Sequence, residues 1–249
     1  MKIAVLSDIH SNVYALQEVI KDAKSKDVDL MLNLGDSFYG PIAPRETYEL
    51  IKENNFINIC GNQDREILEA SLDTLEKNKT LKYVYEDLGE DVLYWIQSLP
   101  FEKFIGDDLY ITHGTQHDDS VYMLEDVKSG KPVLRTDKEI LELIDDVESK
   151  FVMCGHSHTA RCANLSTGQV VINPGSVGLQ AYKDEKPYIH KIENLTSDAS
   201  YVILNVNTEE YNLELVKVPY DYEKAALKAE ENGREDWAYS LRTGKVLDT

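Results

Sequence analysis

Five short apolar segments in the first 160 residues each lead into a polar motif, and this arrangement limits the possible folds. Runs of this length predict buried strands. In a sheet that alternates strands with helices, residues just past the carboxyl ends of the strands converge on one crevice. The apolar runs cover residues 3–6, 30–34, 56–60, 109–111 and 151–154. The residues that follow them are, in order, Asp8 and His10, Asp36, Asn62, His113, and His156 with His158.

The rest of the chain predicts a single domain over residues 1–249. Apolar residues recur at helical spacing over 13–23, where Asn12 can cap a helix, and Pro44 favours the start of a second helix. A second, largely antiparallel sheet is predicted from later strand-like runs at 161–163, 170–173, 201–206 and 211–216. Two helices are expected within 220–243, and the polar stretches 115–137 and 181–198 indicate surface insertions.

Charge and cysteine content narrow the class of protein. The chain has 26 basic and 45 acidic residues, a formal charge of −19. Such a surface repels polyphosphate backbones, so we expect a small phosphorylated substrate, attracted by bound metal, rather than a long nucleic acid. No apolar run approaches the roughly 18 residues that span a bilayer, and no secretion signal precedes the first strand. The chain has three cysteines and no Cys-x-x-Cys motif, which is typical of a protein in a reducing compartment. We therefore expect a soluble cytoplasmic protein without membrane contacts. The sequence leaves the oligomeric state open.

The motifs differ in how specifically they indicate metal binding. Asp8 and His10 alternate at a strand end and can face one ion together, but such a pair also suits a turn. Asn62 can bind a metal through its amide oxygen or can cap the helix that follows. The two histidines of Gly155-His156-Ser157-His158 have few structural uses at the end of a strand. This last motif is therefore the strongest local indication of a metal site.

Taken together, the motifs resemble those of the calcineurin-like metallophosphoesterases. Asp-x-His, Gly-Asp, Gly-Asn-x-Asp, His-Gly and Gly-His-x-His occur in this order, and the resemblance covers about residues 1–176. It is greatest for the small bacterial and archaeal phosphodiesterases, while Val218-Pro219-Tyr220-Asp221 is loosely similar to diadenosine-tetraphosphate hydrolases. The resemblance implies a four-layer αββα sandwich, in which helices flank two packed mixed sheets.

The same resemblance implies a centre of two divalent metal ions. One ion would be held by Asp8, His10 and His158, the other by Asn62, His113 and His156, and Asp36 would bridge them. Mn²⁺ is the metal most often implied, and Fe, Zn or Ni can occupy such sites. Two ions about 3.5–4 Å apart would provide a bridging hydroxide and neutralise charge during displacement at phosphorus.

Residues near Asn62 are candidate catalytic and substrate-binding groups. Many relatives have a histidine after the Gly-Asn pair, where it assists the leaving group; here Gln63 occupies that position and cannot supply a proton. We therefore expect good leaving groups, such as a nucleotide phosphate or an aryl alcohol. Asp64 would orient a metal ligand, or simply favour the helix start. Arg65 and Asn12 are candidate substrate-binding residues, with a solvated helix residue and a helix cap as the respective alternatives.

These features predict a dinuclear metal-dependent phosphoesterase that hydrolyses a small phosphodiester or nucleotide. The alternative enzymes are a protein phosphatase or nuclease of the same superfamily, and the acidic charge argues against DNA. A non-catalytic scaffold is also considered, because this fold occurs in a retromer subunit that has lost part of its metal site. All seven ligand positions are filled here, which favours the enzyme. The two remaining histidines, His117 and His190, are expected at the surface.

Overall fold

The computed structural model describes residues 1–207 and 210–248 and contains two five-stranded sheets. In spatial order, the first sheet consists of β14 (Tyr211–Val218), β13 (Ala199–Val206), β1 (Lys2–Leu6), β2 (Leu30–Asn33) and β3 (Ile57–Asn58). The last three of these strands run parallel, whereas β13 is antiparallel to both of its neighbours.

The second sheet is built in the same mixed manner. Its strands are, in spatial order, β4 (Glu102–Ile105), β5 (Leu109–Thr112), β8 (Phe151–Met153), β10 (Val170–Asn173) and β9 (Arg161–Asn164). The three central strands are parallel and both edge strands are antiparallel. Two small hairpins pair β6 (Glu125–Asp126) with β7 (Val133–Leu134), and β11 (Ala181–Asp184) with β12 (His190–Glu193).

The later strands do not form a sheet of their own, so that prediction was wrong. β13 and β14 extend the first sheet past β1, whereas β9 and β10 extend the second sheet past β8. The physical reason is that β1 and β8 each have a second edge, whose backbone groups must be hydrogen-bonded once the strand is buried. A strand-like pattern in the sequence predicts that a segment forms a strand, but it does not predict which strand it pairs with.

Helices cover the outer faces of both sheets. The helices of the described residues are α1 (Val13–Ser25), α2 (Pro44–Glu53), α3 (Asn62–Leu68), α4 (Leu72–Lys77), α5 (Lys79–Leu88), α6 (Glu90–Gln97), α7 (Asp137–Ile144), α8 (Tyr222–Glu231) and α9 (Glu235–Thr243). As predicted, α1 is capped by the Asn12 side chain, α2 begins at Pro44, and two helices lie within 220–243.

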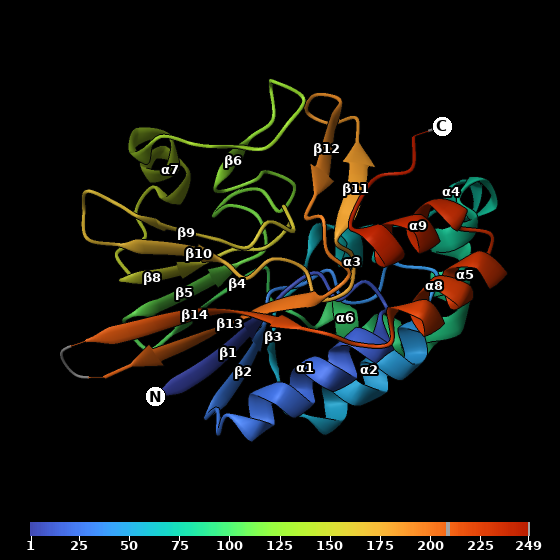
Figure 1. Ribbon diagram of the computed structural model, residues 1–249, viewed down its shortest axis with the longest axis horizontal. Helices are drawn as coiled ribbons and strands as arrows, with labels where there is room; N and C mark the ends of the chain where they lie inside the picture. The colour runs from blue at the N-terminus through green and yellow to red at the C-terminus, as the bar shows by residue number, and fades with distance from the viewer. Residues whose placement is uncertain (208–209, 249) are drawn as a thin grey trace.

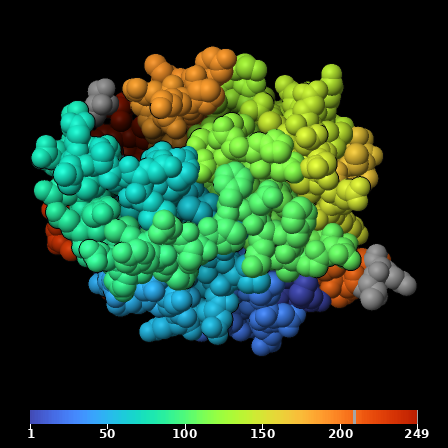
Figure 2. All heavy atoms as spheres, turned by 180° about the vertical axis from the view of Figure 1, so that it is seen from behind, coloured from blue at the N-terminus to red at the C-terminus, as the bar shows by residue number. Residues whose placement is uncertain are grey.

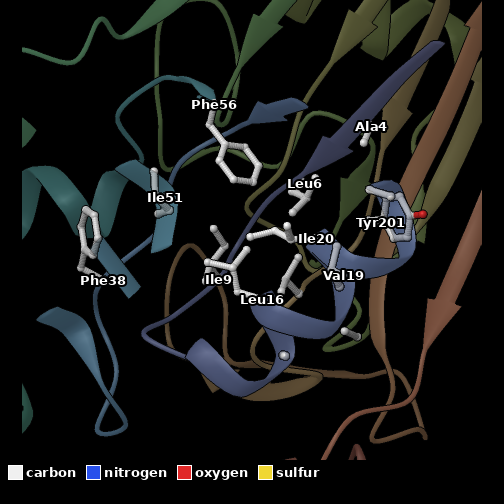
Figure 3. Close-up of a cluster of buried hydrophobic side chains, with 14 of the residues drawn as sticks. Ala4, Leu6, Ile9, Leu16, Val19, Ile20, Phe38, Ile51, Phe56 and Tyr201 are labelled. Carbon is white, nitrogen blue, oxygen red and sulfur yellow. The ribbon is translucent and has the colours of Figure 1, made fainter. Parts of the chain in front are cut away.

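Side chains along a strand alternate between the two faces of its sheet, so neighbouring residues of one strand belong to different apolar cores. Ile3 and Val5 of β1 face the core between the two sheets. Ala4, between them, faces the helical side together with Leu16 of α1, as Figure 3 shows. On the outer face of the second sheet, Val152 packs against a cluster that includes residues of α7. The resulting layers are helix, sheet, sheet and helix (Figure 1), which confirms the predicted sandwich of two mixed sheets flanked by helices.

The loops that carry the polar motifs leave the two sheets on the same side of the sandwich. In Figure 1 this side adjoins the β11–β12 hairpin, and α9 lies next to it. The fold therefore brings together residues that are up to 150 positions apart in the sequence. Among the described residues, no helix has the length and apolar character required to cross a membrane.

Candidate metal centre

Backbone hydrogen bonds hold the motif-bearing loops beside one another. The N–H of His10 donates to the carbonyl of Asp36 at 3.0 Å, which joins the loops after β1 and β2. The N–H of Gly155 donates to the carbonyl of His113 at 2.8 Å, which joins the loops after β8 and β5. Parallel strands end at the same edge of a sheet, so their loops can pair in this way. The seven predicted ligands thus lie in one region.

Asp8, His10 and His158 form the first cluster of potential ligands. The Nε2 atoms of the two histidines are 3.0 Å apart, and Asp8 Oδ1 lies 3.3 Å from the His158 nitrogen. Nδ1 of His10 is 2.9 Å from the Tyr39 carbonyl, and Nδ1 of His158 is 2.7 Å from the Leu179 carbonyl. A carbonyl only accepts, so each Nδ1 carries a hydrogen, and this tautomer presents the Nε2 lone pair to the cluster.

This first cluster fits a divalent metal ion. Two lone pairs that face each other at this distance repel, unless a cation lies beside them. Asp8 Oδ1 is buried and has no hydrogen-bond partner among the described residues, so a further acceptor adjoins the same space. Two nitrogens that bind one ion at about 2.1 Å, with a right angle between them, lie about 3 Å apart. The observed separation of 3.0 Å between the histidine nitrogens agrees with this geometry.

Asp36, His113 and His156 form the second cluster. His113 Nε2 lies 3.0 Å from Asn62 Oδ1 and 3.3 Å from Asp36 Oδ2. The same nitrogen is 4.0 Å from Asp8 Oδ1, so the second cluster adjoins the first. Nitrogen and oxygen atoms of these kinds are competent ligands for divalent transition metals. The two clusters together can accommodate two neighbouring ions.

The electrostatics of the clusters determine the protonation of three histidine ligands at neutral pH. Burial lowers the pKa of His10 and His156 to about 4, so both rings are uncharged and able to bind a metal. Burial also disfavours charge on His113, but the Asp36 carboxylate outweighs this effect and raises the pKa of His113 to about 10. In the metal-free protein, Nε2 of His113 therefore carries a proton. This is the nitrogen that would bind a metal. Metal binding would release that proton.

The ligand loops carry backbone strain. Ten non-glycine residues among those described have positive φ, and half of them are predicted ligands: Asp8, His10, Asp36, His156 and His158. The left-handed conformation costs a residue with a side chain about 1–2 kcal/mol. Strain of this kind persists only where the surrounding structure holds it, and it gathers at functional sites. Its concentration here marks these loops as the functional part of the fold.

A cavity of about 890 Å³ opens onto both clusters. Small-molecule sites in proteins generally measure about 300–1,000 Å³, so the space suits a small ligand. Its floor includes His10, Asp36, Asn62, His156 and His158, and its walls include Arg65, Trp237 of α9 and hairpin residues 181–186. Figure 2 shows the hairpin, in orange, projecting beside the cyan region that contains α3.

Gln63 and Arg65 both line this cavity but differ in how firmly other residues hold their side chains. Gln63 Oε1 is buried and has no hydrogen-bond partner among the described residues, so no hydrogen bond to this oxygen holds the side chain in place. The Arg65 guanidinium donates to both Asp119 carboxylate oxygens at 2.8 Å and to Glu69 at 2.9 Å. Arg65 would have to give up part of this pairing to bind a phosphate.

Asp64 lies behind the cavity and connects two ligand loops. Its carboxylate accepts from the backbone N–H of Ser37 at 3.0 Å and from that of Gly61 at 3.2 Å. These residues adjoin the ligands Asp36 and Asn62, so Asp64 fixes one loop against the other. Burial, together with the neighbouring Asp36 charge, raises the pKa of Asp64 to about 7. These hydrogen bonds are those that the orienting role of Asp64 requires, and that role stays a prediction.

The remaining sequence candidates lie outside the two clusters. Asn12 is buried, its oxygen accepts from a backbone N–H of α1 at 3.1 Å, and its amide donates to the Gly178 carbonyl at 3.0 Å. These bonds account for Asn12 as a helix cap. His117 is exposed, as predicted. The surface prediction for His190 was wrong: it is 1% exposed, and its Nε2 lies 2.9 Å from the Tyr122 hydroxyl, in a pocket that folding creates.

Sequence analysis missed three residues that contact the histidine ligands. The ring centre of Tyr182 is 4.5 Å from that of His158, and the ring centre of Tyr122 is 4.7 Å from that of His156. The Asn194 amide donates to the His158 carbonyl at 2.8 Å. All three lie in the polar stretches 115–137 and 181–198. The short apolar run at 121–124, which contains Tyr122, could have indicated burial there, whereas no such run contains Tyr182 or Asn194.

Comparison with known proteins decides the family. A model described as the calcineurin-like phosphoesterase superfamily domain matches residues 1–195. The chain belongs to this superfamily. The family resemblance predicted from the ordered motifs is therefore confirmed, and the protein is a phosphoester hydrolase of a metal-dependent family.

Three relatives resemble this phosphoesterase over most of its length. An uncharacterized protein of Methanocaldococcus jannaschii is 27% identical, with 94% of each chain covered. A metallophosphoesterase from Sphaerobacter thermophilus has 22% identity and a TM-score of 0.76, with 98% of this chain and 100% of that chain covered. A protein provisionally named a diadenosine tetraphosphatase has 16% identity and a TM-score of 0.53, with 88% and 94% covered. At these identities the two solved structures support the fold.

Proposed function

We propose that this phosphoesterase uses two divalent metal ions to hydrolyse a small phosphodiester or nucleotide. The observation that carries the proposal is the pair of adjoining, buried ligand clusters that open onto one cavity. Asp8, His10 and His158 would hold one ion, Asn62, His113 and His156 would hold the other, and Asp36 would contact both. When bound, such ions supply a hydroxide nucleophile near neutral pH and neutralise phosphoryl charge. Mn²⁺ is the proposed metal, with Fe, Zn and Ni as alternatives.

The residues around the clusters would orient the ester and influence which leaving groups can depart. The Gln63 amide lines the cavity and can donate a hydrogen bond to a phosphoryl oxygen. It cannot donate a proton to a departing alkoxide. We therefore expect the enzyme to prefer esters whose leaving alcohol has a low pKa, such as an aryl alcohol or a nucleotide phosphate.

Size and charge favour a small anionic substrate. The cavity of about 890 Å³ can enclose a nucleotide-sized molecule. Lys183 and Lys186 line it, but so do the carboxylates of Glu66, Asp184, Glu185 and Asp236. Bound metal would therefore be the main attraction for an anion. The chain as a whole has a formal charge of −19, which repels a long nucleic acid. These features support a small phosphodiester over the nuclease alternative.

Removal and return of metal tests the proposed function. We expect chelator-treated protein to lose hydrolysis of bis-p-nitrophenyl phosphate and to regain it with Mn²⁺. With the reconstituted protein, alkyl phosphodiesters should react much more slowly than aryl ones, because Gln63 supplies no proton. Rates should be compared for the four candidate metals at equal occupancy. If none of them restores hydrolysis of any aryl or nucleotide ester, the proposed function is wrong and the scaffold alternative gains support.

A further inference from the structure

We propose that the β11–β12 hairpin is a clamp on the two histidine ligands that follow β8. Tyr182 on β11 and Asn194 just after β12 are the positioning residues of this clamp. By holding the carbonyls of His156 and His158, they set the affinity of the centre for metal. The proposal rests on the metal centre of the proposed function, but it does not depend on which ester is hydrolysed.

The histidine loop needs external support because two of its residues adopt a strained backbone. His156 has φ of 66° and His158 has φ of 55°, both in the left-handed region. From the metal side, Asp8 Oδ2 accepts from the N–H of His156 at 3.1 Å. This bond reaches the backbone of His156 but not that of His158. The conformation must be held from the opposite side as well.

The hairpin provides this support from its open end, where β11 begins and β12 ends. The Tyr182 hydroxyl donates to the His156 carbonyl at 3.2 Å, and the Asn194 amide donates to the His158 carbonyl at 2.8 Å. Among the described residues, neither carbonyl has another hydrogen-bond donor. Asn194 is anchored in turn, because its N–H donates to the Gln180 carbonyl at 3.1 Å. Each strained histidine is thus connected to a different strand of the hairpin.

Ring packing strengthens the clamp. The Tyr182 ring lies against His158, with ring centres 4.5 Å apart, and the Tyr122 ring lies against His156, with centres 4.7 Å apart. The hydroxyls of the two tyrosines are 2.7 Å apart. The polar stretches 115–137 and 181–198 therefore meet directly behind the ligand rings, as the adjacent positions of β6 and the hairpin in Figure 1 indicate.

His190 orients the hydroxyls in this contact. Its Nδ1 is 2.7 Å from the Tyr188 carbonyl, so this contact selects the tautomer in which Nδ1 carries the hydrogen and Nε2 accepts. The Tyr122 hydroxyl, 2.9 Å from Nε2, must donate to it. The Tyr122 oxygen is then left to accept, so the Tyr182 proton is shared between Tyr122 and the His156 carbonyl. The buried histidine thus makes Tyr182 the donor in both contacts, to the Tyr122 oxygen at 2.7 Å and to the His156 carbonyl at 3.2 Å.

The test is a comparison of Mn²⁺ affinity in variants of the full chain. We expect Tyr182→Phe and Asn194→Ala each to weaken Mn²⁺ binding roughly tenfold, as is usual when partners of metal ligands are removed. Tyr188→Phe is the matched control, because it removes a tyrosine hydroxyl from the same hairpin at a half-exposed position. It should bind Mn²⁺ like the parent protein. Calorimetric titration of chelator-treated protein gives the affinities without any assay of hydrolysis.

Thermal unfolding of the metal-free variants separates positioning from general stability. The positioning role predicts that Tyr182→Phe keeps a melting temperature close to that of the parent, since the ring remains in place, while its Mn²⁺ affinity falls. Should Asn194→Ala fail to fold, the Tyr182→Phe result decides alone. Parent-like affinity in Tyr182→Phe would overturn the proposal. If the parent binds Mn²⁺ but hydrolyses no ester, the proposed function fails while the clamp is still tested.

Discussion

Replacing Asp36 with asparagine should reduce phosphoester hydrolysis at least about a thousandfold. Asp36 Oδ2 lies 3.3 Å from His113 Nε2, and its Oδ1 accepts from the backbone N–H of Gln63 at 2.8 Å. Asparagine preserves the size of the side chain but removes the charge that would hold two cations together. Electrostatic stabilisation from a metal centre accounts for several kcal/mol of a barrier, and about 1.4 kcal/mol corresponds to a tenfold change in rate.

Asp73→Asn is the control for this substitution. Asp73 is an exposed residue of α4 that pairs with Lys77 on the same helix, so the same chemical change occurs far from the ligand clusters. The control should hydrolyse bis-p-nitrophenyl phosphate at the parental rate. The Asp36→Asn variant should also bind Mn²⁺ more weakly in a titration. Parental activity in Asp36→Asn would show that Asp36 is not part of the reacting centre.

Gly155→Ala should disrupt the ligand loops by steric overlap. A Cβ at Gly155 would lie 2.0 Å from Ser7 Oγ and 3.1 Å from Asp8 Oδ2, so the loops after β1 and β8 would have to separate. Overpacking of this kind costs about 1–3 kcal/mol of stability. Displacing a reacting group by about 1 Å can cost 10²-fold in rate. We expect chemical denaturation to report the lower stability and the ester assay to report about a hundredfold loss.

A second substitution shows whether this overlap is the cause. Ser7 Oγ is the atom in closest conflict, and it has no hydrogen-bond partner among the described residues. Ser7→Ala alone should therefore have little effect, and Ser7→Ala combined with Gly155→Ala should recover much of the lost stability and activity. A double-mutant cycle measures this coupling. Additive losses in the double variant would contradict the steric explanation.

The fold was predictable as far as local patterns determine it. Pro44, the spacing of apolar residues in α1 and the apolar runs of β1 and β8 identify those elements from sequence alone. Strand pairing was not predictable in the same way. β13 lies beside β1 although about 200 residues separate them, since Lys2 is paired with Asn205. Edge positions depend on which backbone groups remain unpaired after the sheets assemble.

The predicted metal ligands could be chosen from the sequence because each closes a strand and belongs to an ordered motif. The residues that hold those ligands were not. His190 is buried only because the segment with Tyr122 and the hairpin with Tyr182 meet around it. The ion pair of Arg65 with Asp119 likewise joins residues 54 positions apart, and no local sequence pattern indicates it. Contacts between irregular segments depend on the finished tertiary structure.

Anomalous X-ray diffraction from crystals soaked in Mn²⁺ is the most direct test of the dinuclear centre. The account predicts two anomalous peaks in one chain. One should lie among Asp8, His10 and His158, the other among Asn62, His113 and His156, with the Asp36 carboxylate between them. A single peak, or peaks away from these seven side chains, would contradict it.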